Sequence, residues 1–131
     1  MMRTTLSFAM VVGLLLSCGQ KQTTGHGSHD YTPLHKGQVI HLADHGPMLE
    51  IVYDQKAGAA KMYVFDAHQK QKSIDKAPAL VISTHDDPIT ATGKDDVWNF
   101  SHPALTGHVH GMRIRITVDG KQYNPDWHPT H

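Results

Sequence analysis

The sequence contains a single cysteine, Cys18, among its 131 residues. A disulfide within the chain is therefore excluded, and so is a metal site or catalytic site built from several thiolates. Lysine and arginine only equal aspartate and glutamate, at 12 each, so no basic surface for nucleic acid is expected. The sequence has neither a G-x-S-x-G nor an H-E-x-x-H motif, and we expect no enzymatic activity.

Only one long hydrophobic run is present, residues 6–16, and it is too short to span a bilayer. Arg3 precedes this run, and a serine and Cys18 follow it. This order of charged, apolar and small-residue segments is typical of an export signal. The sequence LLSC at 15–18 resembles the lipobox of bacterial lipoproteins, whose cysteine is acylated and becomes the mature N-terminus. The resemblance implies a signal peptide at 1–17, and the alternative is an ordinary cleaved signal in which the cysteine has no role.

The resemblance to lipoproteins also implies a location. An acylated Cys18 would hold the protein to a lipid bilayer of the bacterial cell envelope. Gly19 stands where some inner-membrane lipoproteins carry an aspartate, which favours the periplasmic face of the outer membrane. The 114 residues that remain after cleavage have 11 lysines and arginines against 12 acidic residues, a net charge of −1. They are enough for one domain with a single core.

The mature chain divides into three parts by composition. Residues 18–36 are polar and glycine-rich without an apolar period, which predicts a flexible tether. Residues 37–124 hold about seven short segments of alternating apolar residues with turn residues between them, and 125–131 form a tail. The middle part predicts an all-β fold, an antiparallel immunoglobulin-like β-sandwich. The expected strands are 38–43, 48–54, 61–67, 79–85, 96–102 and 111–119, with a final hairpin closed at Asp119-Gly120.

Histidine is the residue in excess. The sequence has 12, as many as all its carboxylates together, and all of them follow Cys18. In the expected strand 96–102, His102 lies on the same face as Trp98 and Phe100, because side chains repeat every two residues. An imidazole therefore continues a row that is otherwise apolar.

The next expected strand shows the same change from apolar residues to imidazole. Its inward row extends back through Met112 to His110 and His108. If His102 and His108 flank a five-residue hairpin loop, they face each other across it. The three imidazoles then predict a site for Cu or Zn, with the thioether of Met112 as a further ligand that favours Cu(I).

Simpler readings of these residues remain open. Exposed imidazoles on a strand need no ligand, and Met112 in an inward row is ordinary core packing. Gly111 could mark a bulge, which would turn the row and separate Met112 from the histidines. Elsewhere, His85 with Asp86 and Asp87 offers a mixed nitrogen and oxygen set, although turn chemistry is favoured there. Of the remaining histidines, we expect His41 to be exposed, His45 to lie in a turn, His26, His29 and His35 to lie in the tether, and His128 and His131 to lie in the tail.

Three segments carry a further likeness: KGQVIHLADHGP at 36–47, YVFDA at 63–67 and VDGKQY at 118–123. In these segments the chain is similar to small exported β-modules found as lipoproteins or fused to heavy-metal efflux adaptors. The similarity implies metal handling, with an efflux or other envelope protein as partner, and it assigns no ligands. HVH at 108–110 resembles the copper-ligand pair of copper/zinc superoxide dismutases, but only 21 residues follow it, too few for their remaining ligands.

Three functions remain open from the sequence. The first is a membrane-anchored lipoprotein that binds Cu or Zn through a histidine cluster, for buffering, sensing or delivery to efflux. The second is an interaction module of an envelope complex that binds no metal. The third is a pH-responsive protein, since histidine ordinarily titrates near pH 6.5.

Overall fold

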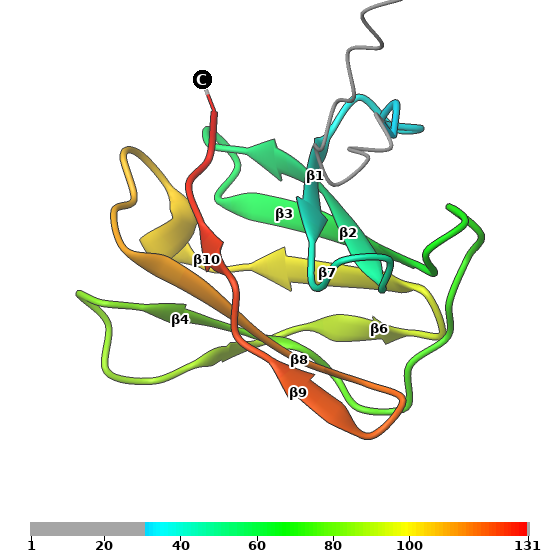
Figure 1. Cartoon of the computed structure of the whole chain (residues 1–131). Helices are drawn as coiled ribbons and strands as arrows, with labels where there is room; N and C mark the ends of the chain where they lie inside the picture. Colours follow the sequence, from blue (N-terminus) through cyan, green and yellow to red (C-terminus); the bar gives the residue numbers. More distant parts are fainter. Residues whose placement is uncertain (1–30, 131) are drawn as a thin grey trace, which may run out of the picture.

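The computed structural model describes residues 31–130, which form two antiparallel sheets and contain no α-helix (Figure 1). The all-β sandwich predicted from the sequence is confirmed. In this part of the chain no helix has the length and apolar character needed to cross a bilayer.

The first sheet has five strands. Their spatial order is β1 (Gln38–His41), β2 (Met48–Asp54), β3 (Ala59–Phe65), β7 (Val97–Ser101) and β6 (Thr92–Lys94). Side chains on one face of these strands point to the core and those on the other face outward, following the period of two.

The second sheet has the order β10 (Asp126–Trp127), β8 (Met112–Val118), β4 (Ala79–Ile82) and β5 (Ile89–Thr90), and β9 (Lys121–Tyr123) also pairs with β8. Asp119 and Gly120 connect β8 to β9 with φ angles of 50° and 77°. Two successive positive φ angles are the signature of a type I′ hairpin turn. The predicted hairpin at Asp119-Gly120 is therefore confirmed.

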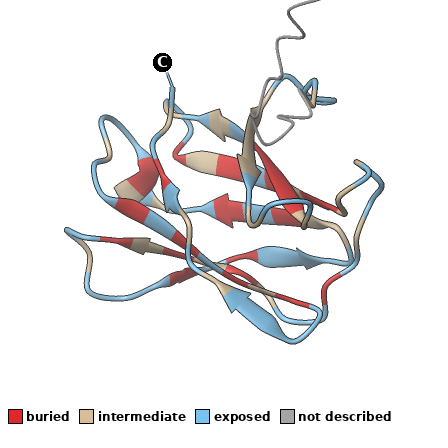
Figure 2. Cartoon of the chain, in the orientation of Figure 1, coloured by how far each residue is buried: buried red, intermediate tan, exposed pale blue. Residues whose placement is uncertain are grey.

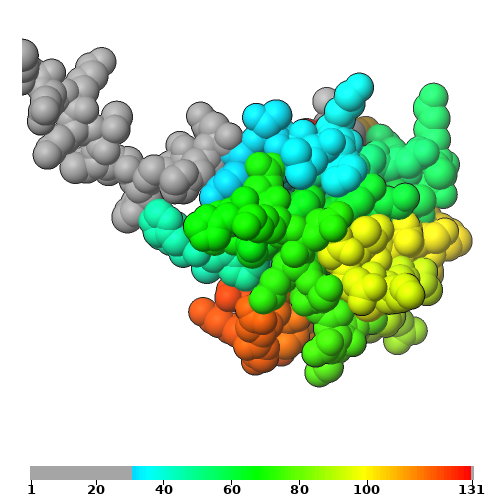
Figure 3. All heavy atoms as spheres, turned by 90° about the vertical axis from the view of Figure 1, so that its right-hand side faces the viewer, coloured from blue at the N-terminus to red at the C-terminus, as the bar shows by residue number. Residues whose placement is uncertain are grey.

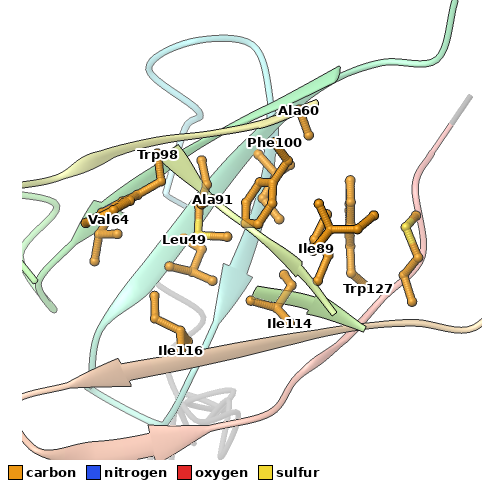
Figure 4. Close-up of a cluster of buried hydrophobic side chains, with 14 of the residues drawn as sticks. Leu49, Ala60, Val64, Ile89, Ala91, Trp98, Phe100, Ile114, Ile116 and Trp127 are labelled. Atoms are coloured by element: carbon orange, nitrogen blue, oxygen red, sulfur yellow. The ribbon is translucent and has the colours of Figure 1, made fainter. Parts of the chain in front are cut away.

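The core lies between the two sheets. Figure 2 shows buried residues in strands of both sheets, and Figure 4 shows the apolar side chains that meet between them. The apolar residues of the strand rows predicted to face inward do so, because they stand at alternate positions. The most buried members include Leu49, Val64, Phe100, Ile114, Ile116 and Trp127.

The folded part of the chain extends beyond the predicted limits of 37 and 124. Trp127 is 1% exposed, and its indole N–H donates to the side chain of Gln38 at 3.2 Å. The backbone N–H of Ile114 donates to the carbonyl of Pro125 at 2.9 Å. The start of the predicted tail is thus strand β10, and residues 31–36, predicted as tether, contact the first sheet as described below.

Candidate functional site

The loop that carries the predicted site, residues 102–111, connects the two sheets. β7 lies in the first sheet and β8 in the second, and no register pairs them. The expectation that His102 and His108 face each other across a hairpin is therefore wrong. Between them lies a single 3₁₀ turn, η1 (Pro103–Leu105), whose Leu105 side chain is fully buried in the core.

Gly111 ends the row that was expected to join Met112 to the histidines. Strand β8 begins only at Met112, and Gly111 before it has a φ of +66°. A Cβ there would lie 2.6 Å from Oγ of Ser83, so glycine alone fits. Met112 is 1% exposed and belongs to the core, which gives it a packing role. His108 and His110 lie outside the strand and are exposed.

A different histidine pair comes together at this end of the sandwich. The rings of His85, in the β4–β5 loop, and His102 have centroids 4.8 Å apart with planes tilted by 56°. The rings of His108 and His110 are 6.3 Å apart and nearly parallel, at 11°. We call these four residues the histidine rim. Both loops lie at the left edge of the molecule in Figure 1.

Backbone and hydroxyl contacts hold the two loops of the histidine rim together. The N–H of Ser83 donates to the carbonyl of Gly111 at 3.1 Å, and Oγ of Ser83 donates to the carbonyl of His110 at 3.3 Å. The hydroxyl of Tyr53, in β2, donates to the carbonyl of Leu105. Burial raises the pKa of Tyr53, so the hydroxyl keeps the proton that it donates. The meeting of His85 with His102 therefore rests on a supported loop pair.

His102 also has a structural role. It is the N-cap of η1, and its Nδ1 accepts a hydrogen bond from the N–H of Ala104 at 3.0 Å. An accepting Nδ1 carries no proton, so the neutral ring holds its proton on Nε2. Metal-ligating histidines usually have the opposite arrangement, in which the second ring nitrogen donates. Metal binding to His102 would therefore compete with this cap.

Among residues 31–130, no group of three or more His, Cys, Asp or Glu side chains is close enough to hold a metal ion. The predicted three-histidine site is accordingly not assembled in this part of the chain, and the closest imidazole contact at the histidine rim is the pair His85–His102. Cys18, the predicted lipidation site, lies outside the described residues.

The first sheet also carries a buried carboxylate on the face that points away from the core, and the sequence analysis did not predict it. Glu50, the only glutamate of the chain, is 1% exposed. It accepts hydrogen bonds from the N–H groups of Leu34 (3.1 Å), His35 (2.6 Å) and Gly37 (3.0 Å). Nδ1 of His35 donates a fourth at 3.0 Å. One signal could have found it: a lone glutamate interrupts the otherwise apolar run MLEIVY at 48–53.

These contacts set the protonation of both partners. Burial alone raises the pKa of Glu50, but the hydrogen bonds from His35 and Gly37 and the charge on His35 outweigh it and lower the pKa below the ordinary glutamate value. The ionised carboxylate only accepts, so Nδ1 of His35 must carry a proton. The His35 ring also stacks on Tyr63, with centroids 3.6 Å apart and planes 2° from parallel.

Comparisons of the chain with protein-family models, curated proteins and solved structures find no match.

Proposed function

We propose that the protein is a lipid-anchored domain of the bacterial cell envelope that binds Cu²⁺ or Zn²⁺ at the histidine rim and passes the ion to an efflux or other envelope protein. The observation that carries the proposal is the meeting of His85 and His102, from separate loops, with ring centroids 4.8 Å apart. The anchor is the acylated Cys18 that the LLSC sequence predicts.

The spacing of the two rings suits a shared ion. A metal–nitrogen bond is about 2 Å long, and each ring centre lies about 1 Å beyond its nitrogen, so two imidazoles on one tetrahedral ion have centres roughly 5 Å apart. The His85–His102 spacing is close to this value. Imidazole is a suitable ligand for both Cu²⁺ and Zn²⁺, and Cu²⁺ stands highest in the ordinary affinity order of the divalent ions.

To bind His102, the ion must break the N-cap hydrogen bond between Nδ1 of His102 and the N–H of Ala104. Ligation through Nδ1 uses the lone pair that now accepts from Ala104, and ligation through Nε2 moves the ring proton to Nδ1, where it faces that N–H. Either way the cap bond is lost, at a cost of about 1 kcal/mol or roughly fivefold in affinity. A site with a built-in competitor and two protein ligands suits exchange with a partner better than storage.

The experiment is a thermal titration of the untagged chain from Cys18 to His131 with Zn²⁺ and with Cu²⁺. Ion present at 100 times its dissociation constant should add about 2.7 kcal/mol to the free energy of unfolding. The N–H resonance of Ala104 should shift in step with binding, because its partner is lost. The double variant His85→Ala/His102→Asn should lose both responses.

Two controls make this test specific. Asparagine at 102 still presents an oxygen to Ala104, so the variant should fold normally without metal. His41→Asn/His68→Asn removes two exposed histidines away from the histidine rim and should leave both responses intact. Retention of the full stabilisation in the rim variant, or its absence from the wild-type chain, contradicts the proposal.

A further inference from the structure

A patch on the outer face of the first sheet is buried although the second sheet does not cover it. The register pairs Met48 with Phe65 and Glu50 with Tyr63, so all four side chains point to the same side. Met48, Glu50 and Phe65 are 1%, 1% and 3% exposed. Residues 31–37, which we call the strap, supply the cover over Glu50, Tyr63 and Phe65. Figure 3 shows the strap in cyan against the green part of the chain.

The attachment of the strap is concentrated at Glu50. None of its residues belongs to a strand, and Leu34 is 60% exposed, so it adds little apolar burial. Glu50 accepts four hydrogen bonds from the strap, including three from consecutive or nearly consecutive backbone N–H groups. Hydrogen bonds to an ionised carboxylate are stronger than neutral ones. One side chain therefore holds most of the strap.

The strap runs along the sheet and away from the histidine rim. At its C-terminal end, a Cβ on Gly37 would meet the carbonyl of Ile51 at 2.6 Å, so this end lies against the middle of β2. At its N-terminal end, the hydroxyl of Tyr31 donates to the carbonyl of Ala67, and the Gln69 side chain donates to the carbonyl of Thr32 at 2.7 Å. Ala67 lies just beyond the C-terminal end of β3.

The opposite end of β3 marks the histidine rim, because the N–H of His102 donates to the carbonyl of Gly58 at 3.0 Å. Strands rise by about 3.3 Å per residue, so Phe65 lies roughly 23 Å along β3 from Gly58. Met62, which pairs with Ile51, lies only about 13 Å from Gly58. The closed strap thus moves the point at which the chain leaves the domain to the end far from the histidine rim.

We propose that Glu50 is a clasp that closes the strap over the first sheet, and that the closed clasp makes the chain leave the domain at the end opposite the histidine rim. An open clasp moves the exit point to Gly37, nearer the histidine rim, and releases residues 31–36 from the sheet. The inference rests on the proposed function in one respect: only if Cys18 is anchored to the bilayer does the exit point decide how the domain is oriented toward it. A closed clasp then turns the histidine rim away from the bilayer and toward partners in the aqueous compartment.

The test uses the single native cysteine and no metal. A nitroxide attached to Cys18 broadens the NMR signals of amides near the exit point of the chain. In the wild-type chain from Cys18 to His131, the broadening should centre on Ala67 and Gln69 and spare Gly58 and His102. In Glu50→Gln, it should spread toward Gly58, and amide exchange at His35 and Gly37 should accelerate by about tenfold or more.

Asp54→Asn is the matched control, because Asp54 lies on the same strand and its carboxylate binds Ala57 within its own turn, at 3.1 Å, instead of the strap. It should behave as wild type in both measurements. His35→Ala is a second route to an open clasp if Glu50→Gln folds poorly, and unchanged amide shifts of Ile114 and Met62 certify the fold. Broadening around the histidine rim in the wild type, or an unchanged pattern in both strap variants, overturns the proposal while leaving metal binding untouched.

Discussion

His102 has two roles, as the N-cap of η1 and as a proposed metal ligand, and substitution can separate them. Asparagine can still act as the N-cap, whereas alanine can fill neither role. The structural role is the N-cap bond from Ala104 to Nδ1 at 3.0 Å. A cap of this kind contributes about 1 kcal/mol. For a domain of about 100 residues, 1 kcal/mol corresponds to about 4–8 °C in melting temperature. His102→Ala should therefore melt about 4–8 °C below wild type.

His102→Asn should melt within about 2 °C of wild type, since asparagine is among the best N-cap residues and supplies an oxygen acceptor. Melting is followed by circular dichroism with a chelator present, so that bound metal adds nothing. Equal losses in both variants would show that the imidazole ring, through its contact with His85, matters more than the cap. No loss in His102→Ala would refute the capping role and with it the competition between cap and ion.

Three further outcomes are expected. Because the pKa of Glu50 is lowered in the folded state, its stabilising contribution is complete above the ordinary glutamate pKa and is lost as pH falls through the lowered value. The free energy of unfolding, measured by urea denaturation, should therefore fall with pH across this acid range in the wild type and fall less steeply in Glu50→Gln. Equal slopes in the two proteins would contradict this prediction. Gly111→Ala should lower the free energy of unfolding by about 1–3 kcal/mol, because φ is +66° and the new Cβ meets Ser83, and adding Ser83→Ala should recover only the part due to the clash. Trp127→Ala should cost about 3–5 kcal/mol in urea denaturation, whereas a true tail residue would cost almost nothing.

The strand pattern was predictable because burial on one face imposes a period of two. Trp98, Phe100, Ile114, Ile116 and Val118 were assigned to the inward face from alternation alone, and all are buried. The Asp119-Gly120 turn was equally readable, since its positive φ angles need residues of that kind. Strand periodicity is a local property, so it can be recognised in each segment without knowing which strands pair.

The pairing of strands depends on residues far apart in the sequence, and the predicted hairpin between His102 and His108 was wrong for this reason. The alternation around His102 and His108 is the same whether β7 and β8 form a hairpin or belong to different sheets, so the sequence could not tell which loop residues meet. The Asp-Asp-Pro sequence after His85 predicts turn chemistry and gives no sign of a ring contact, yet the β4–β5 loop places His85 beside His102. Glu50 was overlooked because an acidic residue in an alternating strand ordinarily faces water, and only the strap makes it buried.

The most direct test of the central claim counts the imidazoles around the ion. X-ray absorption at the Zn edge, with one Zn²⁺ per chain, reports the number and distance of nitrogen ligands. Two imidazole nitrogens at about 2 Å are expected in the wild-type chain, and their loss is expected in His85→Ala/His102→Asn. An unchanged imidazole count in that variant would place the ion elsewhere and contradict metal binding by His85 and His102.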